Sequence, residues 1–312
     1  MTFEGLGLEF LEVVAPLLES LAPIMPGNTF PRFFTMEMMQ RSLLASLMVT
    51  IVAGILGVFL IIQNLSLIGD GLAHVSFGGV AVAIVLGATN PLWYALLFSV
   101  IAAILIHELQ ARDILTGDAS IAIFLTGVLS IGLISLTVWG GGVTADIHSY
   151  LFGSQLLIDK GTLNWITYVC IFALIAMALI GPSLLACIVD PLAARVQGLP
   201  VKGIGLLFSI ITAGAVVTMV KVVGALLVTA LLVTPAATAQ LVGNSFRSCM
   251  IWTQIFGISS VLIGLYLSSE LETGSGSMIA LVTAIVFCLV ALIRATFANQ
   301  IDSFTNPEIS KE

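Results

Sequence analysis

Apolar stretches of roughly 20 residues recur from one end of the chain to the other, and this pattern constrains the fold more than any other feature. A helix rises about 1.5 Å per residue, so a stretch of that length crosses about 30 Å of hydrocarbon. Of the 312 residues, 59% are hydrophobic and only 9% are charged, whereas soluble domains carry about 25% charged residues. The sequence therefore predicts an integral membrane protein with an all-α, polytopic helical bundle, since membrane β-barrels show short alternating strands instead.

Nine membrane spans are predicted, and the pattern is compatible with eight to ten. The predicted spans cover residues 42–62, 66–87, 91–108, 119–139, 163–187, 203–220, 222–242, 250–268 and 278–296. Six of the ten Lys and Arg residues fall on the side that also holds the polar connections 107–118, 190–202 and 243–248. Because cytoplasmic loops carry an excess of Lys and Arg, this weak bias places the N-terminus outside and the C-terminus in the cytoplasm.

The pattern divides the chain into an amphipathic N-terminal extension (1–35), a transmembrane domain (36–298) and a cytoplasmic tail (299–312). At the start of the extension, the glutamates at positions 4, 9, 12 and 19 fall within one wide sector of a helix, and the apolar residues lie mostly away from it. This arrangement predicts a helix at the membrane interface. The alternative is a poorly ordered extension.

Several classes of protein are excluded by composition and motifs. The net charge is −7 and there is no block of basic residues, which excludes a nucleic-acid-binding protein. The serine-hydrolase elbow, the metalloprotease histidine pair and the phosphate-binding loop are all absent from the sequence. The chain is therefore not predicted to be an enzyme, and any ATP hydrolysis would take place on a partner chain. Four singly scattered cysteines are interpreted as packing residues: Cys170, Cys187, Cys249 and Cys288.

Two ionisable residues lie inside an otherwise apolar, glycine-rich predicted span. Asp70 and His74 are four residues apart, so on a helix they share one face, about one turn apart. An ionisable side chain in the membrane costs at least a few kcal/mol and usually faces a pore, a partner or an ion pathway. One carboxylate and one imidazole together suit zinc, manganese or iron(II), whereas calcium and magnesium prefer oxygen ligands alone. The alternative is a structural hydrogen bond between Asp70 and His74.

Two further groups of polar residues are weaker candidates. Asp146 and His148 lie in a predicted outer loop, where they form either a second, transient metal contact or an ordinary loop. His107 stands beside Glu108 at the cytoplasmic end of a predicted span, where a solvated helix terminus is expected.

The polar connection that begins at Asp190 has the pattern of a short helix. Pro191 suits the first turn of a helix, and Gly198 suits the residue just after its end. Such a helix on the cytoplasmic membrane face could transmit motion from a separate ATPase, and the alternative is a plain turn. The predicted coupling segment consists of Asp190, Pro191, Leu192, Ala193, Ala194, Arg195, Val196, Gln197 and Gly198.

Six segments resemble, in order along the chain, the signatures of one family, the permease subunits of ABC importers for zinc, manganese or iron(II). They are residues 66–83 (SLIGDGLAHVSFGGVAVA), 116–127 (TGDASIAIFLTG), 149–157 (SYLFGSQLL), 189–201 (VDPLAARVQGLPV), 221–241 (KVVGALLVTALLVTPAATAQL) and 266–282 (YLSSELETGSGSMIALV). The chain departs from the family at Gln63 and Asn64, where pairs of Arg or Lys are frequent, and in the length of its N-terminal extension.

The resemblance implies a homodimer in the cytoplasmic membrane that takes metal from an extracytoplasmic metal-binding protein and is driven by cytoplasmic ATP-binding subunits. It implies that Asp70 and His74 are metal ligands of the translocation pathway and that residues 190–198 form the coupling helix. The transported zinc, manganese or iron is the substrate, and no permanently bound cofactor is expected. Two rival functions are an ion-coupled carrier that works without an ATPase and an intramembrane enzyme that uses Asp70 and His74 as acid and base.

Overall fold

The computed structural model describes residues 5–139, 150–151, 153 and 158–305, with side chains described up to residue 296. The described residues contain no strand, and eight of their helices are long and apolar enough to cross a membrane. These helices are α3 (Glu37–Ile62), α4 (Ile68–Val85), α5 (Pro91–Ala111), α6 (Gly117–Trp139), α8 (Lys160–Val189), α10 (Val201–Val223), α13 (Phe246–Glu270) and α14 (Ser275–Thr305). The prediction of an all-α membrane bundle is confirmed.

The seventh predicted span, residues 222–242, is not one continuous helix, which corrects the prediction. α10 extends into it, and Gly224 then turns the chain with a φ of 94° before α11 (Val228–Leu232) and α12 (Thr234–Val242). Pro235 lies in the first turn of α12, where its missing N–H group suits the start of a helix but cannot continue a preceding one. Apolar residues continue almost without a break through residues 222–242, so the sequence pattern did not indicate the breaks at Gly224 and before α12.

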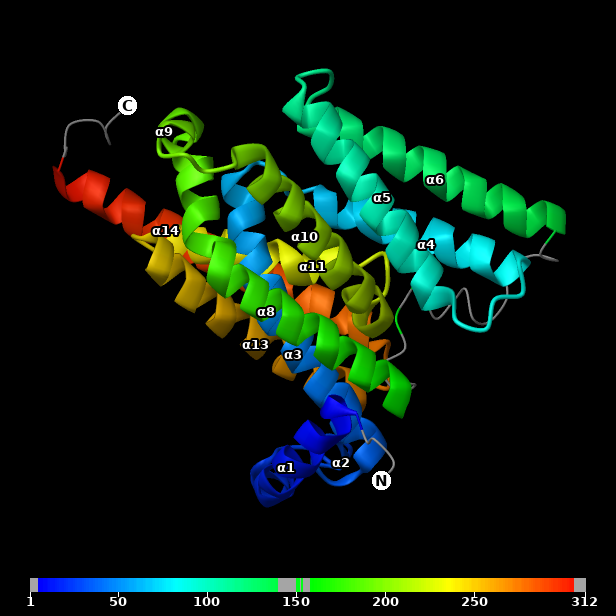
Figure 1. Ribbon diagram of the computed structural model, residues 1–312. Coiled ribbons are helices and arrows are strands. Elements are labelled where there is room, and N and C mark those ends of the chain that lie inside the picture. The colour runs from blue at the N-terminus through cyan, green and yellow to red at the C-terminus, as the bar shows by residue number, and fades with distance from the viewer. Residues whose placement is uncertain (1–4, 140–149, 152, 154–157, 306–312) are drawn as a thin grey trace.

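α11 and α12 together carry the chain back across the bundle. α10 and α13 begin at the same end, where Phe59 near the end of α3 packs against Phe208 and Phe246 with ring centroids 6.1 and 5.3 Å apart. Within the described residues the chain therefore crosses nine times, once through two short helices. As a result α9 (Pro191–Val196) and α1 (Leu6–Leu21) lie at opposite ends of the bundle (Figure 1).

α4, α5 and α6 gather on one side of the bundle, where α4 packs most extensively against α6 (Figure 1). Glycines set the distance between these two helices. A Cβ atom at Gly78 of α4 would lie 2.7 Å from the carbonyl oxygen of Val128, and one at Gly132 of α6 would lie 2.7 Å from the Gly78 Cα atom. The two backbones therefore approach closely, as small residues permit in lipid.

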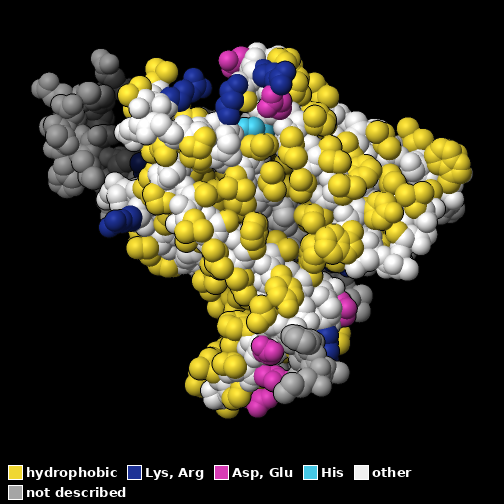
Figure 2. All heavy atoms as spheres, viewed as in Figure 1, with side chains coloured by type: hydrophobic (Ala, Val, Ile, Leu, Met, Phe, Trp, Pro, Cys, Tyr) yellow, Lys and Arg dark blue, Asp and Glu magenta, His cyan; other side chains and the backbone are white. Residues whose placement is uncertain are grey.

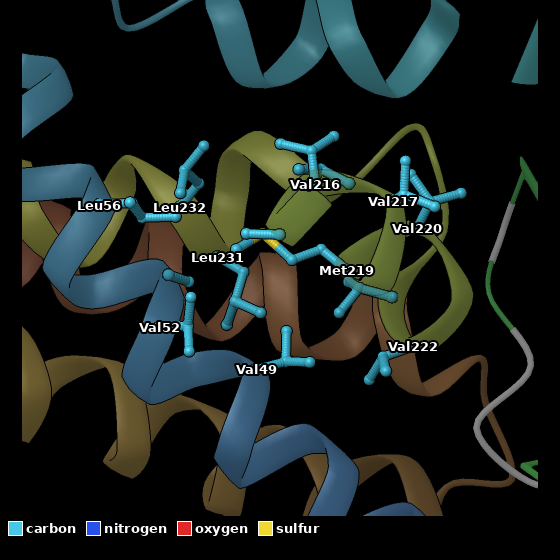
Figure 3. Packing of buried hydrophobic residues seen from close by; sticks show 14 of the residues in the cluster. Val49, Val52, Leu56, Val216, Val217, Met219, Val220, Val222, Leu231 and Leu232 are labelled. Carbon is cyan, nitrogen blue, oxygen red and sulfur yellow. The ribbon is translucent and has the colours of Figure 1, made fainter. Parts of the chain in front are cut away.

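α3, α4 and α10 are the most buried of the spanning helices. Figure 3 shows Val49, Val52 and Leu56 of α3 facing Met219 of α10 and Leu231 of α11. By contrast, α6, α8 and α14 are mostly exposed and carry large apolar side chains on their open faces. Hydrophobic side chains cover the flank visible in Figure 2, while charged side chains gather toward its two ends. Such a surface suits contact with lipid.

The N-terminal extension folds against the bundle at the end opposite α9. The helix predicted near its start is present as α1, followed by a short 3-10 turn, η1 (Ala22–Ile24), and by α2 (Arg32–Thr35). The backbone N–H of Leu8 donates to Oδ1 of Asn164 on α8 at 3.2 Å. The alternative of an unstructured extension does not apply to the described residues of this segment.

Candidate functional site

Asp70 and His74 lie in the first half of α4, one turn apart, as predicted. Nε2 of His74 is 3.7 Å from Oδ1 of Asp70, which is too long for a hydrogen bond. The alternative of a structural hydrogen bond therefore gains no support from this geometry. Transition metals bind such atoms at about 2.0–2.2 Å, so one ion could bridge the two ligands without moving the helix.

The pair lies on a face of α4 that its own chain leaves partly open. The side chain of Asp70 is 33% exposed and that of His74 is 16% exposed, whereas the neighbouring Leu72 and Val75 are fully buried. Within the described part of the chain, Nδ1 of His74 is buried and has no hydrogen-bond partner. A buried polar atom without a partner is costly. The single chain thus leaves the imidazole incompletely satisfied.

The interruption in the seventh crossing lies beside this pair. Leu232, the last residue of α11, packs its side chain against Gly69 of α4. Its carbonyl oxygen lies against Gly57 of α3, so close that a Cβ atom there would overlap it. Interrupted helices next to ionisable groups are typical of ion sites in transporters, because the interruption frees backbone groups inside the membrane. Gly57 and Gly69 provide the room for this arrangement.

One chain supplies only two ligands at this position. Among the described residues, no group of three or more His, Cys, Asp or Glu side chains could hold a metal ion. Structural zinc sites normally have four protein ligands, so a two-ligand site suits transient contact with an ion in transit. The second predicted contact, Asp146 and His148, lies outside the described residues.

The predicted coupling segment contains a helix, α9, so the alternative of a plain turn is wrong. Oδ1 of Asp190 accepts hydrogen bonds from the backbone N–H groups of Leu192 and Ala193 at 3.0 and 2.9 Å, which caps the first turn. At the other end, Gly198 adopts a φ of 83°, a left-handed conformation that terminates helices and favours glycine.

α9 carries exposed apolar side chains at the end of the bundle opposite α1. Leu192 is 72% exposed and Val196 is 89% exposed, while Ala194 packs inward. Arg195 is exposed beside them. A short, capped helix with apolar and basic side chains open to solvent can serve as a docking surface for another protein.

His107 has a specific partner that the sequence analysis missed. Its Nε2 atom lies 3.1 Å from the carbonyl oxygen of Lys202, so this nitrogen donates a hydrogen bond to the first turn of α10. A Cβ atom at Gly205 would lie 2.7 Å from the His107 ring, so the glycine makes room for it. No local pattern could reveal a contact between residues 95 positions apart. Through it, α5 supports the segment that follows α9.

Comparison with known proteins adds to this geometry. The sequence profile of the ABC 3 transport family matches residues 35–294. The manganese transport system membrane protein MntC of Halalkalibacterium halodurans is 31% identical, over 83% of this chain and 88% of the relative. The high-affinity zinc uptake system membrane protein ZnuB of Haemophilus influenzae is 30% identical, over 81% of this chain and 96% of the relative.

Two solved structures share the fold. PsaBC from Streptococcus pneumoniae, solved in complex with Fab, contains a chain that superposes with a TM-score of 0.73 at 30% identity, over 83% of this chain and 92% of that one. An inward-facing conformation of a putative metal-chelate type ABC transporter superposes with a TM-score of 0.65 over 92% of this chain and 98% of that one. At 17% identity, the second likeness concerns the fold alone.

Proposed function

This chain belongs to the ABC 3 transport family, and we propose that it is the permease subunit of an importer for zinc, manganese or iron(II). The observation that carries the proposal is the Asp70 and His74 pair, which lies inside a membrane-spanning helix on a face that its own chain leaves partly open. Relatives named for manganese and for zinc transport match the chain at about the same identity, 31% and 30%. The proposal therefore covers both metals and extends to iron(II) by the nature of the ligands.

The substrate ion contacts Asp70 and His74 from two copies of the chain. The partly open face of α4, where Nε2 of His74 and Oδ1 of Asp70 lie 3.7 Å apart, supports a partner across this face. Two copies supply two carboxylates and two imidazoles, which is enough for a four-ligand site between them. Such a site holds the ion while the pathway is open to one side and releases it when the ligands separate.

ATP hydrolysis takes place on a cytoplasmic partner chain that docks on α9. The exposed Leu192 and Val196 supply apolar contact area, and Arg195 supplies a charge that sets the orientation. Asp190 and Gly198 fix both ends of α9, so a push from the partner moves the helix as a unit. An extracytoplasmic binding protein delivers the metal at the opposite end of the bundle.

The test of the proposal is metal uptake by vesicles that contain the permease and its ATP-binding subunit. The Asp70→Asn, His74→Ala double variant is expected to lose uptake of zinc and manganese while it inserts and assembles normally. Asp118→Asn removes an exposed carboxylate from the first turn of α6 and is the matched control, with uptake close to wild type. Uptake by the double variant at near wild-type rate would show that the pair is structural.

The same vesicles separate this function from a carrier that works alone. Uptake by the permease without its ATP-binding subunit, driven by a proton or sodium gradient, would support the carrier and contradict the proposal. Uptake that requires the ATP-binding subunit, and that requires ATP on the side of the membrane where this subunit is bound, supports the importer.

A further inference from the structure

An apolar groove lies on the flank of the bundle, where α1 of the N-terminal extension packs against it. The groove lies between α1, α3 and α8, and its lining is almost entirely apolar. The residues that define it are Phe10 and Val13 of α1, Met48 and Ile51 of α3, and Cys170 and Ile171 of α8. Glu9 of α1 stands at its rim as the one charged residue among those that line it.

The groove lies at the depth of the hydrocarbon. Ile51 is 14 residues past Glu37, the first residue of α3, which corresponds to about 21 Å along the helix. Ile171 is 11 residues past Lys160, the first residue of α8, or about 17 Å. Both helices belong to the membrane-spanning set. The interior of the groove is therefore continuous with the surface that these helices present to lipid.

α1 has the sequence of an interfacial helix. Its exposed apolar residues recur at the helical spacing i, i+4, i+7 and i+11: Leu6, Phe10, Val13 and Leu17. The adjacent stripe, with Leu11 and Leu18, is buried against the bundle. The apolar sector is thus wider than its packing on protein requires, and Leu6, Phe10 and Val13 of its exposed part line the groove. A helix of this kind inserts its apolar face between lipid chains.

The negative charge of Glu9 at the rim of the groove favours some lipid headgroups over others. α1 carries Glu9, Glu12 and Glu19 and contains no Lys or Arg. The lysine at the start of α8, Lys160, is paired with Glu37, with Nζ 3.5 Å from Oε1. Of these carboxylates only Glu9 lines the groove, and it favours an ammonium group that donates hydrogen bonds over an anionic headgroup.

From these observations we propose that the groove binds one acyl chain of a phospholipid whose headgroup ends in a primary ammonium, of the phosphatidylethanolamine type. The chain lies between α1, α3 and α8, and the ammonium group contacts Glu9. The extension is thereby a lipid-binding element that anchors α1 to the leaflet at its end of the bundle.

The experiment uses tryptophan as a reporter and lipids with brominated acyl chains as quenchers. Phe10→Trp places the reporter in the groove, and Phe172→Trp places a matched reporter on the open face of α8, outside the groove residues. Full-length protein is reconstituted in phosphatidylcholine nanodiscs with increasing fractions of brominated phosphatidylethanolamine, phosphatidylcholine or phosphatidylglycerol. The emission of the four native tryptophans is subtracted with the wild type.

The groove reporter is expected to be quenched at a lower fraction of brominated phosphatidylethanolamine than the control reporter. An exposed ion pair is worth about 0.2–1 kcal/mol, so the preference over phosphatidylglycerol should be about 1.4-fold to fivefold at Phe10→Trp and absent at Phe172→Trp. Glu9→Gln in the Phe10→Trp background should remove the preference while quenching itself persists.

Three outcomes would overturn the proposal. Identical quenching curves for the two reporters would show only ordinary lipid around the bundle. Absence of quenching at Phe10→Trp would show that the groove is closed or covered by protein, such as a second copy of the chain. Equal quenching by all three headgroups at Phe10→Trp would remove the role assigned to Glu9.

Discussion

Oε1 of Glu270 accepts two hydrogen bonds from Thr29, one from its backbone N–H at 2.9 Å and one from its Oγ1 at 2.8 Å. The same oxygen also accepts from the backbone N–H groups of Asn28 and Phe30 at 3.0 and 3.1 Å. Phe30 is buried and packs edge-on against Tyr266, with ring centroids 5.5 Å apart. A single carboxylate at the end of α13 thus holds the turn between η1 and α2 within the N-terminal extension.

Glu270→Ala is expected to release this turn because four donors lose their shared acceptor. Amide hydrogen exchange at residues 28–30 should become faster, with little change in the interior of α3. Glu12→Ala removes an exposed carboxylate from α1 and serves as the control. Unchanged exchange at residues 28–30 in Glu270→Ala would show that the packing of Phe30 alone holds the turn.

Gly57→Ala is expected to destabilise the protein because its Cβ atom would overlap the carbonyl oxygen of Leu232. Overpacking of this kind costs about 1–3 kcal/mol. Gly127→Ala is the matched control, since no atom lies within 4 Å of a Cβ there and alanine in a helix gains up to about 1 kcal/mol over glycine. In detergent, the midpoint temperature of thermal unfolding should be lower than that of the wild type for Gly57→Ala and not for Gly127→Ala. Equal midpoints would show that α11 moves aside at no cost.

Asp159 gives the start of α8 a pH-dependent cap. Its Oδ1 accepts from the backbone N–H of Thr162 at 3.2 Å. Partial burial by itself would raise the pKa of the Asp159 carboxyl, but the hydrogen bonds from Thr162, together with those from the backbone of Asp159 and Gly161, outweigh it and hold this pKa below its ordinary value. Asp159→Ala should cost about 1 kcal/mol at neutral pH.

The sign of the pH dependence follows from that lowered pKa. The stabilisation is fully present above the unfolded-state pKa of about 3.9 and is lost as pH falls through the lower folded-state pKa. The difference in melting temperature between wild type and Asp159→Ala should therefore shrink only below about pH 4. A difference that already declines between pH 7 and 5 would contradict this account.

Arg195→Glu is expected to uncouple ATP hydrolysis from metal uptake because it reverses the charge on the docking surface of α9. Uptake per ATP hydrolysed should fall, while the amount of inserted permease stays constant. Asn244→Ala changes an exposed residue in the connection between α12 and α13, outside the coupling segment, without changing charge and is the control. Normal uptake per ATP in Arg195→Glu would remove this residue from the coupling contact.

The nine crossings predict that the two ends of the bundle face different compartments. A cysteine in place of Glu12 should react with an impermeant thiol reagent in intact cells, after subtraction of the wild-type signal. A cysteine in place of Val196 should react only after the membrane is permeabilised. The reverse pattern would place α9 outside and contradict its contact with a cytoplasmic ATPase.

The sequence was most informative where a local pattern sufficed. Length and apolarity located eight spanning helices, the i, i+4 spacing placed Asp70 and His74 on one face, and the Asp-Pro and Gly signals bounded α9. The interruption in residues 222–242 was missed because apolar residues continue through it. It depends on close contacts of Leu232 with two other helices.

Long-range contacts account for the remaining misses. The acceptor role of Glu270 toward Thr29 links positions 241 residues apart, and the contact of His107 with Lys202 links positions 95 residues apart. From the sequence, His107 was expected at a solvated helix terminus, and Glu270 had no assigned role. Only the packing of the helices shows what those groups bind.

α8 connects the two ends of the protein without interruption. Near its start, Asn164 binds the backbone of α1, and just past its end Asp190 caps α9. A helix of 30 residues, with Pro182 inside it, is about 45 Å long, so it is long enough to bridge the full thickness of the membrane. Under the proposed function, the end of α8 that receives the N-terminal extension and the end that leads into the proposed ATPase contact belong to one helix, so the extension is tied to that contact through a single element.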